Sequence, residues 1–172
     1  MATPALRFAL ALPLVFAPGL IACDSGNDHG HDETAGETHD GHGETHGQAD
    51  CADETRDDEF AIGLSKSSES ATVSFVAADP APPAIDDNTW TVQISDPDGQ
   101  PLTDASITTV TPMMPDHGHG TPSVATVTAT GNPAEFEISP VNMFMAGLWE
   151  VTLDIDLGGG TTEQVVFAFC VE

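Results

Sequence analysis

The chain has 172 residues, of which 28 are acidic and only three are basic, so its formal net charge at pH 7 is -25. Such an acidic surface repels nucleic acid and anionic lipid headgroups, which excludes nucleic acid as a partner and favours cations.

The amino terminus is typical of a bacterial lipoprotein signal. Residues 8–21 are apolar and uncharged, follow a single Arg7, and are too short to span a bilayer as a permanent helix. The segment ends in Leu-Ile-Ala-Cys, which resembles the lipobox whose cysteine is acylated. We therefore predict a signal peptide over residues 1–22 and an exported protein that membrane lipid anchors through Cys23, on the periplasmic face or at the cell surface. The alternative is that Cys23 is a buried or paired cysteine behind an ordinary cleavage site.

Residues 23–59 form a second region, in which Asp, Glu, His, Gly and Thr dominate. Beyond Cys23 this region has no aromatic residue and no aliphatic residue larger than alanine, so it cannot bury enough apolar surface to fold. We predict a disordered acidic tether. Its five histidines suit low-affinity binding of Zn²⁺, Ni²⁺ or Cu²⁺, although a solubilising spacer fits the same composition. These histidines are His29, His31, His39, His42 and His46.

From residue 60 to residue 172, short β-rich runs alternate with Pro, Gly, Asn and Asp. Several runs alternate between apolar and polar residues as half-buried strands do; Trp90, Val92 and Ile94, for example, are expected to face a core. Such runs with turn signals between them predict an all-β domain, an antiparallel β-sandwich of about seven strands. The predicted strands cover residues 72–76, 89–94, 106–110, 123–128, 135–138, 148–155 and 163–169.

Three cysteines in an exported protein leave one without a cysteine partner. If Cys23 carries lipid, Cys51 and Cys170 remain as a natural pair. A disulfide between them would tie the two ends of the domain together in an oxidising compartment. The alternative is that both are free thiols or metal ligands.

Four of the five methionines and both histidines of the domain fall in two short stretches. Thioethers are soft donors that select Cu(I), and imidazole binds both copper states, so these stretches predict an open, exchangeable copper site. The structural alternative is that Met113 and Met145 plug the end of the core, while the imidazoles hydrogen-bond backbone carbonyls of a glycine-rich turn. The candidate ligands are His117, His119, Met113, Met114, Met143 and Met145.

Three motifs resemble the YtkA-like family of exported domains, which is related to the FixH-like proteins. They are Met-Pro-Asp-His-Gly-His-Gly at 114–120, Phe-Met-Ala-Gly-Leu-Trp-Glu-Val at 144–151 and Val-Phe-Ala-Phe-Cys at 166–170. The resemblance extends from Asn88 to the carboxyl terminus. It implies an immunoglobulin-like sandwich outside the cytoplasm and a loose link to copper handling or to the maturation of respiratory oxidases. It supplies no established ligands.

No enzymatic activity is expected, because the domain shows no recognisable pair of nucleophile and base. The leading hypothesis is a lipid-anchored metal-binding protein, with copper as cofactor or cargo and a metal-receiving protein as a possible partner. A different hypothesis is a structural or protein-interaction sandwich that binds no metal. A third is a metal buffer in which only the tether binds ions.

Overall fold

The computed structural model describes residues 51–172. Nine strands and one short 3-10 helix make up the regular structure of this part of the chain. The elements are η1 (Cys51–Asp53), β1 (Ser65–Ser67), β2 (Thr72–Asp79), β3 (Asp86–Ser95), β4 (Ser106–Met114), β5 (His119–Gly120), β6 (Thr126–Ala129), β7 (Glu135–Met143), β8 (Gly147–Asp156) and β9 (Thr162–Val171).

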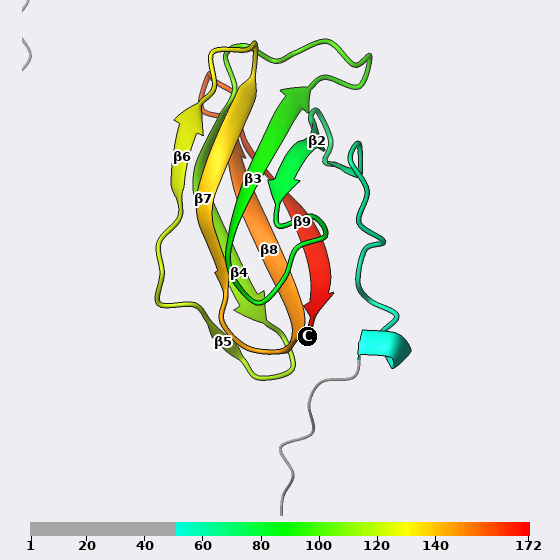
Figure 1. The fold of residues 1–172 in the computed structure, drawn as a ribbon. Coiled ribbons are helices and arrows are strands. Elements are labelled where there is room, and N and C mark those ends of the chain that lie inside the picture. Colours follow the sequence, from blue (N-terminus) through cyan, green and yellow to red (C-terminus); the bar gives the residue numbers. More distant parts are fainter. Residues whose placement is uncertain (1–50) are drawn as a thin grey trace, which may run out of the picture. The chain divides into compact units, whose positions relative to one another are not determined.

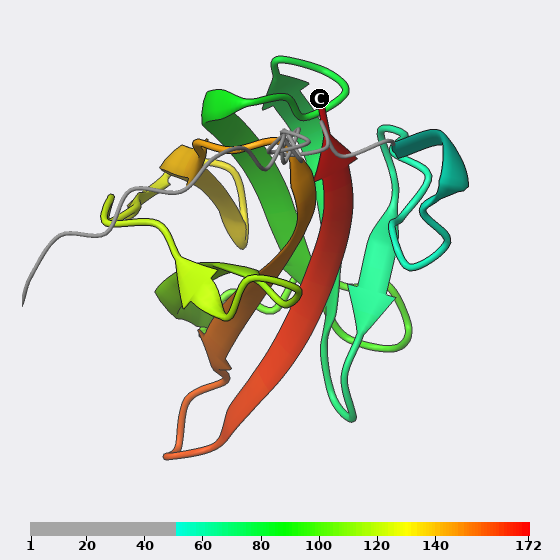
Figure 2. The same ribbon diagram turned by 90° about the horizontal axis from the view of Figure 1, so that it is seen from below.

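The strands form two antiparallel sheets, one with the order β1-β2-β3-β7-β6 and the other with the order β5-β4-β8-β9. Figure 1 shows the two layers, and Figure 2 views them from the end where the chain terminates. Each of the seven predicted strands overlaps one of the observed strands, and β1 and β5 are short additions. The predicted all-β sandwich is therefore confirmed.

The core lies between the sheets and is built by the predicted alternation. On β3, Trp90, Val92 and Ile94 are fully buried, whereas the residues between them are partly exposed. The Trp90 ring lies 5.0 Å from that of Phe75 in an edge-on arrangement, and Phe167 and Phe169 extend the aromatic cluster from β9. These rings bury the largest apolar area per residue, so they fix how the two sheets pack.

Residues 51–58, called the strap below, run beside β9 at the start of the described chain (Figure 1). A disulfide joins Cys51 to Cys170, which confirms the predicted pairing. Asp58 donates its backbone N–H to the carbonyl of Ala168 (2.7 Å), and its carboxylate accepts from the Ala168 N–H (2.9 Å) and from Lys66. The strap overlaps the last residues of the predicted tether, and these covalent and polar attachments hold it although it lacks large apolar side chains.

The predicted signal peptide, the lipidation site at Cys23 and the five tether histidines all lie outside the described residues, so they stay predictions. Within residues 51–172, no helix has the length and apolar character that crossing a membrane requires.

Candidate metal centre

The histidine motif forms a tight hairpin between β4 and β5. Met114 pairs with His119 and Met113 pairs with Gly120, and the N–H groups of His117 and Gly118 both donate to the Met114 carbonyl (3.2 and 2.9 Å). Gly118 adopts a positive φ of 67°, which glycine accommodates without strain. The hairpin thus extends β4 through the two methionines, beyond the predicted end at residue 110.

Gly120 brings the two strands of this hairpin unusually close together. A Cβ at this position would lie 2.7 Å from the Pro112 carbonyl oxygen and 2.9 Å from the sulfur of Met113. The Met113 thioether therefore covers the backbone of β5 on one face of the hairpin. Only glycine allows this approach, so Gly120 fixes the position of its neighbour His119.

His119 lies on the inner side of the hairpin, at the rim of the core. Directly paired residues of antiparallel strands share a face, so His119 lies on the same face as the buried Met114. Its half-buried ring stacks on Phe144 at 5.8 Å and meets the edge of the buried Trp149 at 6.5 Å. Aromatic rings from β8 and from the β7–β8 loop therefore hold one imidazole in a defined place.

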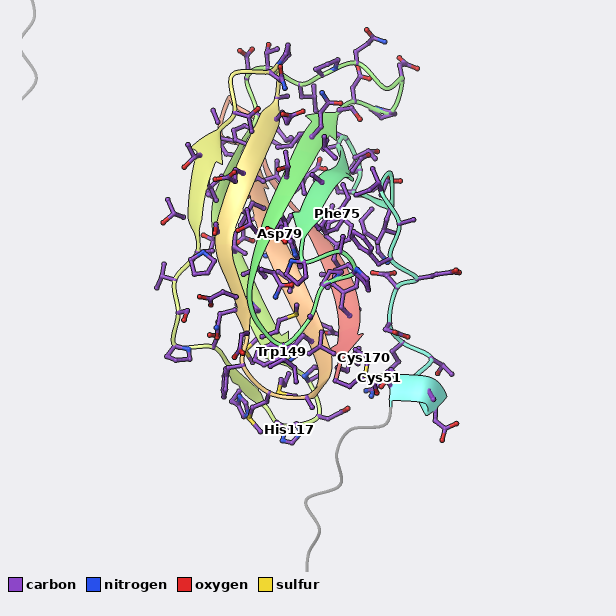
Figure 3. All side chains as sticks on the ribbon, in the orientation of Figure 1. Cys51, Phe75, Asp79, His117, Trp149 and Cys170 are labelled. Carbon is purple, nitrogen blue, oxygen red and sulfur yellow. A yellow bond between two sulfur atoms is a disulfide. The ribbon has the colours of Figure 1, made fainter. Side chains whose placement is uncertain are left out.

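His117 lies at the exposed tip of the hairpin, and its ring centroid is 5.6 Å from that of His119. Figure 3 shows it at the same end of the sandwich as Trp149 and the disulfide. Neither imidazole forms a hydrogen bond with another residue in the described part of the chain. The structural alternative expected such bonds from the imidazoles to backbone carbonyls, and residues 51–172 do not contain them.

The four candidate methionines divide into two pairs. Met114 and Met143 are 1% and 0% exposed and belong to the core, whereas Met113 and Met145 are each 38% exposed. The structural alternative placed Met113 and Met145 in the core, whereas Met114 and Met143 are the pair buried there. Met113 points to the face of the hairpin opposite His119, because it pairs with Gly120. Of the two hairpin thioethers, only that of Met114 shares a face with an imidazole.

The β7–β8 loop carries Phe144, which contacts His119, and the neighbouring Met145. The indole N–H of Trp149 donates to the Met145 carbonyl at 2.9 Å, which fixes the loop against β8. The Phe144 ring is 40% exposed and lies 5.6 Å from the Trp149 ring. The loop therefore places a partly exposed aromatic ring against His119, and its Met145 side chain is also partly exposed.

Asp116, at the tip of the hairpin, binds Arg56 of the strap. Arg56 donates through Nη1 and Nη2 to both carboxylate oxygens of Asp116 (2.8 and 2.7 Å), and also binds Glu54 (2.6 Å). Hydrogen bonds from Arg56 lower the pKa of Asp116 and bring the pKa of Glu54 to about 2. Sequence reasoning missed Arg56; the one available signal was that it is one of only two basic residues that follow the predicted signal peptide.

The donors at this end are thus two imidazoles, thioethers and the carboxylates of Asp116 and Glu54, both bound by Arg56. Across residues 51–172, no three His, Cys, Asp or Glu side chains are grouped so that they could hold a metal ion. The soft and borderline donors present suit a copper ion better than a hard cation.

Two solved structures align with this chain at low similarity. A DUF4426 family protein from Pseudomonas aeruginosa PAO1 aligns with a TM-score of 0.45 and 11% identity over 63% of this chain and 96% of that chain. FetP from uropathogenic E. coli strain F11 aligns with a TM-score of 0.43 and 12% identity over 64% of this chain and 94% of that chain. No curated protein matches the sequence.

The YtkA-like family model matches residues 67–154, just over half of the chain. The match runs from the end of β1 into β8, so it includes the histidine hairpin and the β7–β8 loop and leaves out the strap and β9. The chain belongs to the YtkA-like family.

Proposed function

We propose that this protein is a lipid-anchored extracytoplasmic protein that binds copper at the β4–β5 end of its sandwich and passes it to another protein. The observation that carries the proposal is the pair of imidazoles of His117 and His119, 5.6 Å apart, one exposed and one on the same face as the Met114 thioether. Imidazole and thioether together form a donor set that favours Cu(I).

The arrangement of these donors suits exchange better than permanent retention. His117 and the Met145 side chain lie at the surface, so a receiving protein can reach an ion bound there. His119 is held by its stacking on Phe144, so part of the site is preorganised before the ion arrives. An ion bound partly by a fixed ligand and partly by exposed ligands can leave stepwise.

Two features support a location outside the cytoplasm. The Leu-Ile-Ala-Cys sequence that ends at Cys23 resembles a lipobox, and the Cys51–Cys170 disulfide fits an oxidising compartment. The predicted tether histidines would raise the local metal concentration near the domain.

The test is a Cu(I) titration of the mature chain in which the five tether histidines are replaced by alanine. A competing chelator and ascorbate keep copper reduced and buffered. We expect one Cu(I) per chain, and a loss of affinity of about 100-fold in the H117A/H119A variant. An unchanged affinity in that variant would refute the site. The chain with its tether histidines restored measures what the tether adds.

A second candidate function is a protein-interaction module without metal. Exposed apolar side chains around the hairpin favour it, since Met113, Phe144 and Met145 are each 38–40% exposed. It predicts that neither imidazole affects copper binding, and that Phe144→Ser abolishes binding of the partner protein.

A further inference from the structure

The candidate site has a potential ligand that would change its metal preference. Asp116 directly precedes His117 on the hairpin tip. A carboxylate beside two imidazoles completes a donor set that Zn²⁺ binds well, and it contributes little to soft Cu(I). A copper site at this hairpin therefore discriminates better against zinc when Asp116 takes no part in it.

Arg56 occupies both oxygens of this carboxylate. Its two terminal nitrogens donate to Asp116 in the bidentate arrangement that matches guanidinium to carboxylate. Arg56 also donates through Nε to Glu54 at 2.9 Å, so the guanidinium itself is fixed from a second side. The Asp116 carboxylate is thus directed to the strap.

The strap holds Arg56 in position from both sides. On one side lies the disulfide from Cys51 to Cys170, and on the other Asp58 exchanges two hydrogen bonds with Ala168. Arg56 stands between these attachments and reaches a residue 60 positions further along the chain. Its contact with Asp116 is therefore a built connection between the strap and the hairpin.

We propose that Arg56 is a positioning residue that sets the metal selectivity of the His117/His119 site by holding the Asp116 carboxylate away from the ion. This inference rests on the proposed function of that site. When Arg56 is removed, Asp116 gains the freedom to ligate, and the site acquires a hard oxygen donor. The binding of Zn²⁺ then tightens while the binding of Cu(I) changes little.

The experiment uses the mature chain with its tether histidines replaced by alanine, and compares Zn²⁺ and Cu(I) affinities in R56Q, D116N and R56Q/D116N. We expect R56Q to bind Zn²⁺ about tenfold or more tightly than the parent and to change Cu(I) affinity less than about threefold. The double variant should return to the parent's selectivity, because no carboxylate is left to release. A shift of the Asp116 carboxyl ¹³C resonance on addition of Zn²⁺ to R56Q, absent in the parent, reports the new ligand directly.

Lys66→Gln is the matched control, since it removes the same charge and another ion pair of this region, that with Asp58. If K66Q tightens Zn²⁺ binding as much as R56Q does, or if R56Q/D116N keeps the gain, net charge explains the effect and the inference is overturned. A third outcome is that Cu(I) binding depends on His117 and His119 but R56Q and the parent have the same selectivity between Zn²⁺ and Cu(I). This outcome overturns the inference about Arg56 and leaves the proposed function standing. Absence of Cu(I) binding in the parent overturns the proposed function as well.

Discussion

Removal of the disulfide should cost a large part of the domain's stability. Cys51 and Cys170 are 119 residues apart, and in the chain-entropy model the opening of a loop of this size lowers the free energy of unfolding by about 5 kcal/mol. Domains are stabilised by only about 5–15 kcal/mol in total. The C51A/C170A variant should therefore be marginally folded, although its core side chains are unchanged.

Urea unfolding followed by Trp fluorescence measures this loss. With an m-value of about 1–3 kcal/mol/M, the midpoint should fall by about 2–5 M, and m itself should rise because the unfolded chain is no longer cross-linked. Wild-type protein unfolded in the presence of a reductant is the matched control and should coincide with the variant. A midpoint that moves by less than about 0.5 M, with m unchanged, would show that the bond does not restrict the unfolded chain.

Three further changes test the hairpin, the core and the strap. Gly120→Ala places a Cβ 2.7 Å from the Pro112 carbonyl oxygen. We therefore expect the free energy of unfolding, measured with urea, to fall by about 1–3 kcal/mol and Cu(I) binding to weaken. Full retention of stability and of Cu(I) affinity would contradict the close approach. Asn88→Leu removes the one buried polar side chain of the described core, which donates to three backbone carbonyls, and should cost about 2–3 kcal/mol by the same assay. Because the folded pKa of Glu54 is about 2, below its ordinary 4.5, the stability it contributes is complete above pH 4.5 and is lost as the pH falls towards 2. A ¹³C titration of its carboxyl should show this low pKa, and a return to the ordinary value in R56Q.

The strands could be predicted because their signal is local. Residues 89–94 alternate between apolar and polar side chains, and the structure buries every second one as the pattern requires. The end of β4 was harder, since Pro112 and two adjacent methionines disguise the same alternation. Pro112 and Met114 face inward there and Met113 faces outward, so the rule holds although the residue types obscure it.

The strap could not be predicted from its composition. Residues 51–58 contain no large apolar side chain, and a segment of that kind is ordinarily disordered. Its order comes from bonds to residues more than 100 positions away, Ala168 and Cys170. Composition indicates how much apolar surface a segment can bury. It does not indicate that a disulfide will form or that the Asp58 carboxylate will accept a hydrogen bond from β9.

The same limit applies to the candidate site. The histidines and methionines could be identified in the sequence because they cluster. Which of them share a face depends on the register between β4 and β5, and this register places Met114 rather than Met113 on the face of His119. Both side chains of the Arg56–Asp116 ion pair are exposed, so the pair contributes little to the free energy of unfolding. Its main effect is to orient the Asp116 carboxylate. Of the 28 acidic residues, Arg56 binds Glu54 and Asp116, the residue next to His117. On the proposed function, this leaves the imidazoles and thioethers as the donors available to a metal ion.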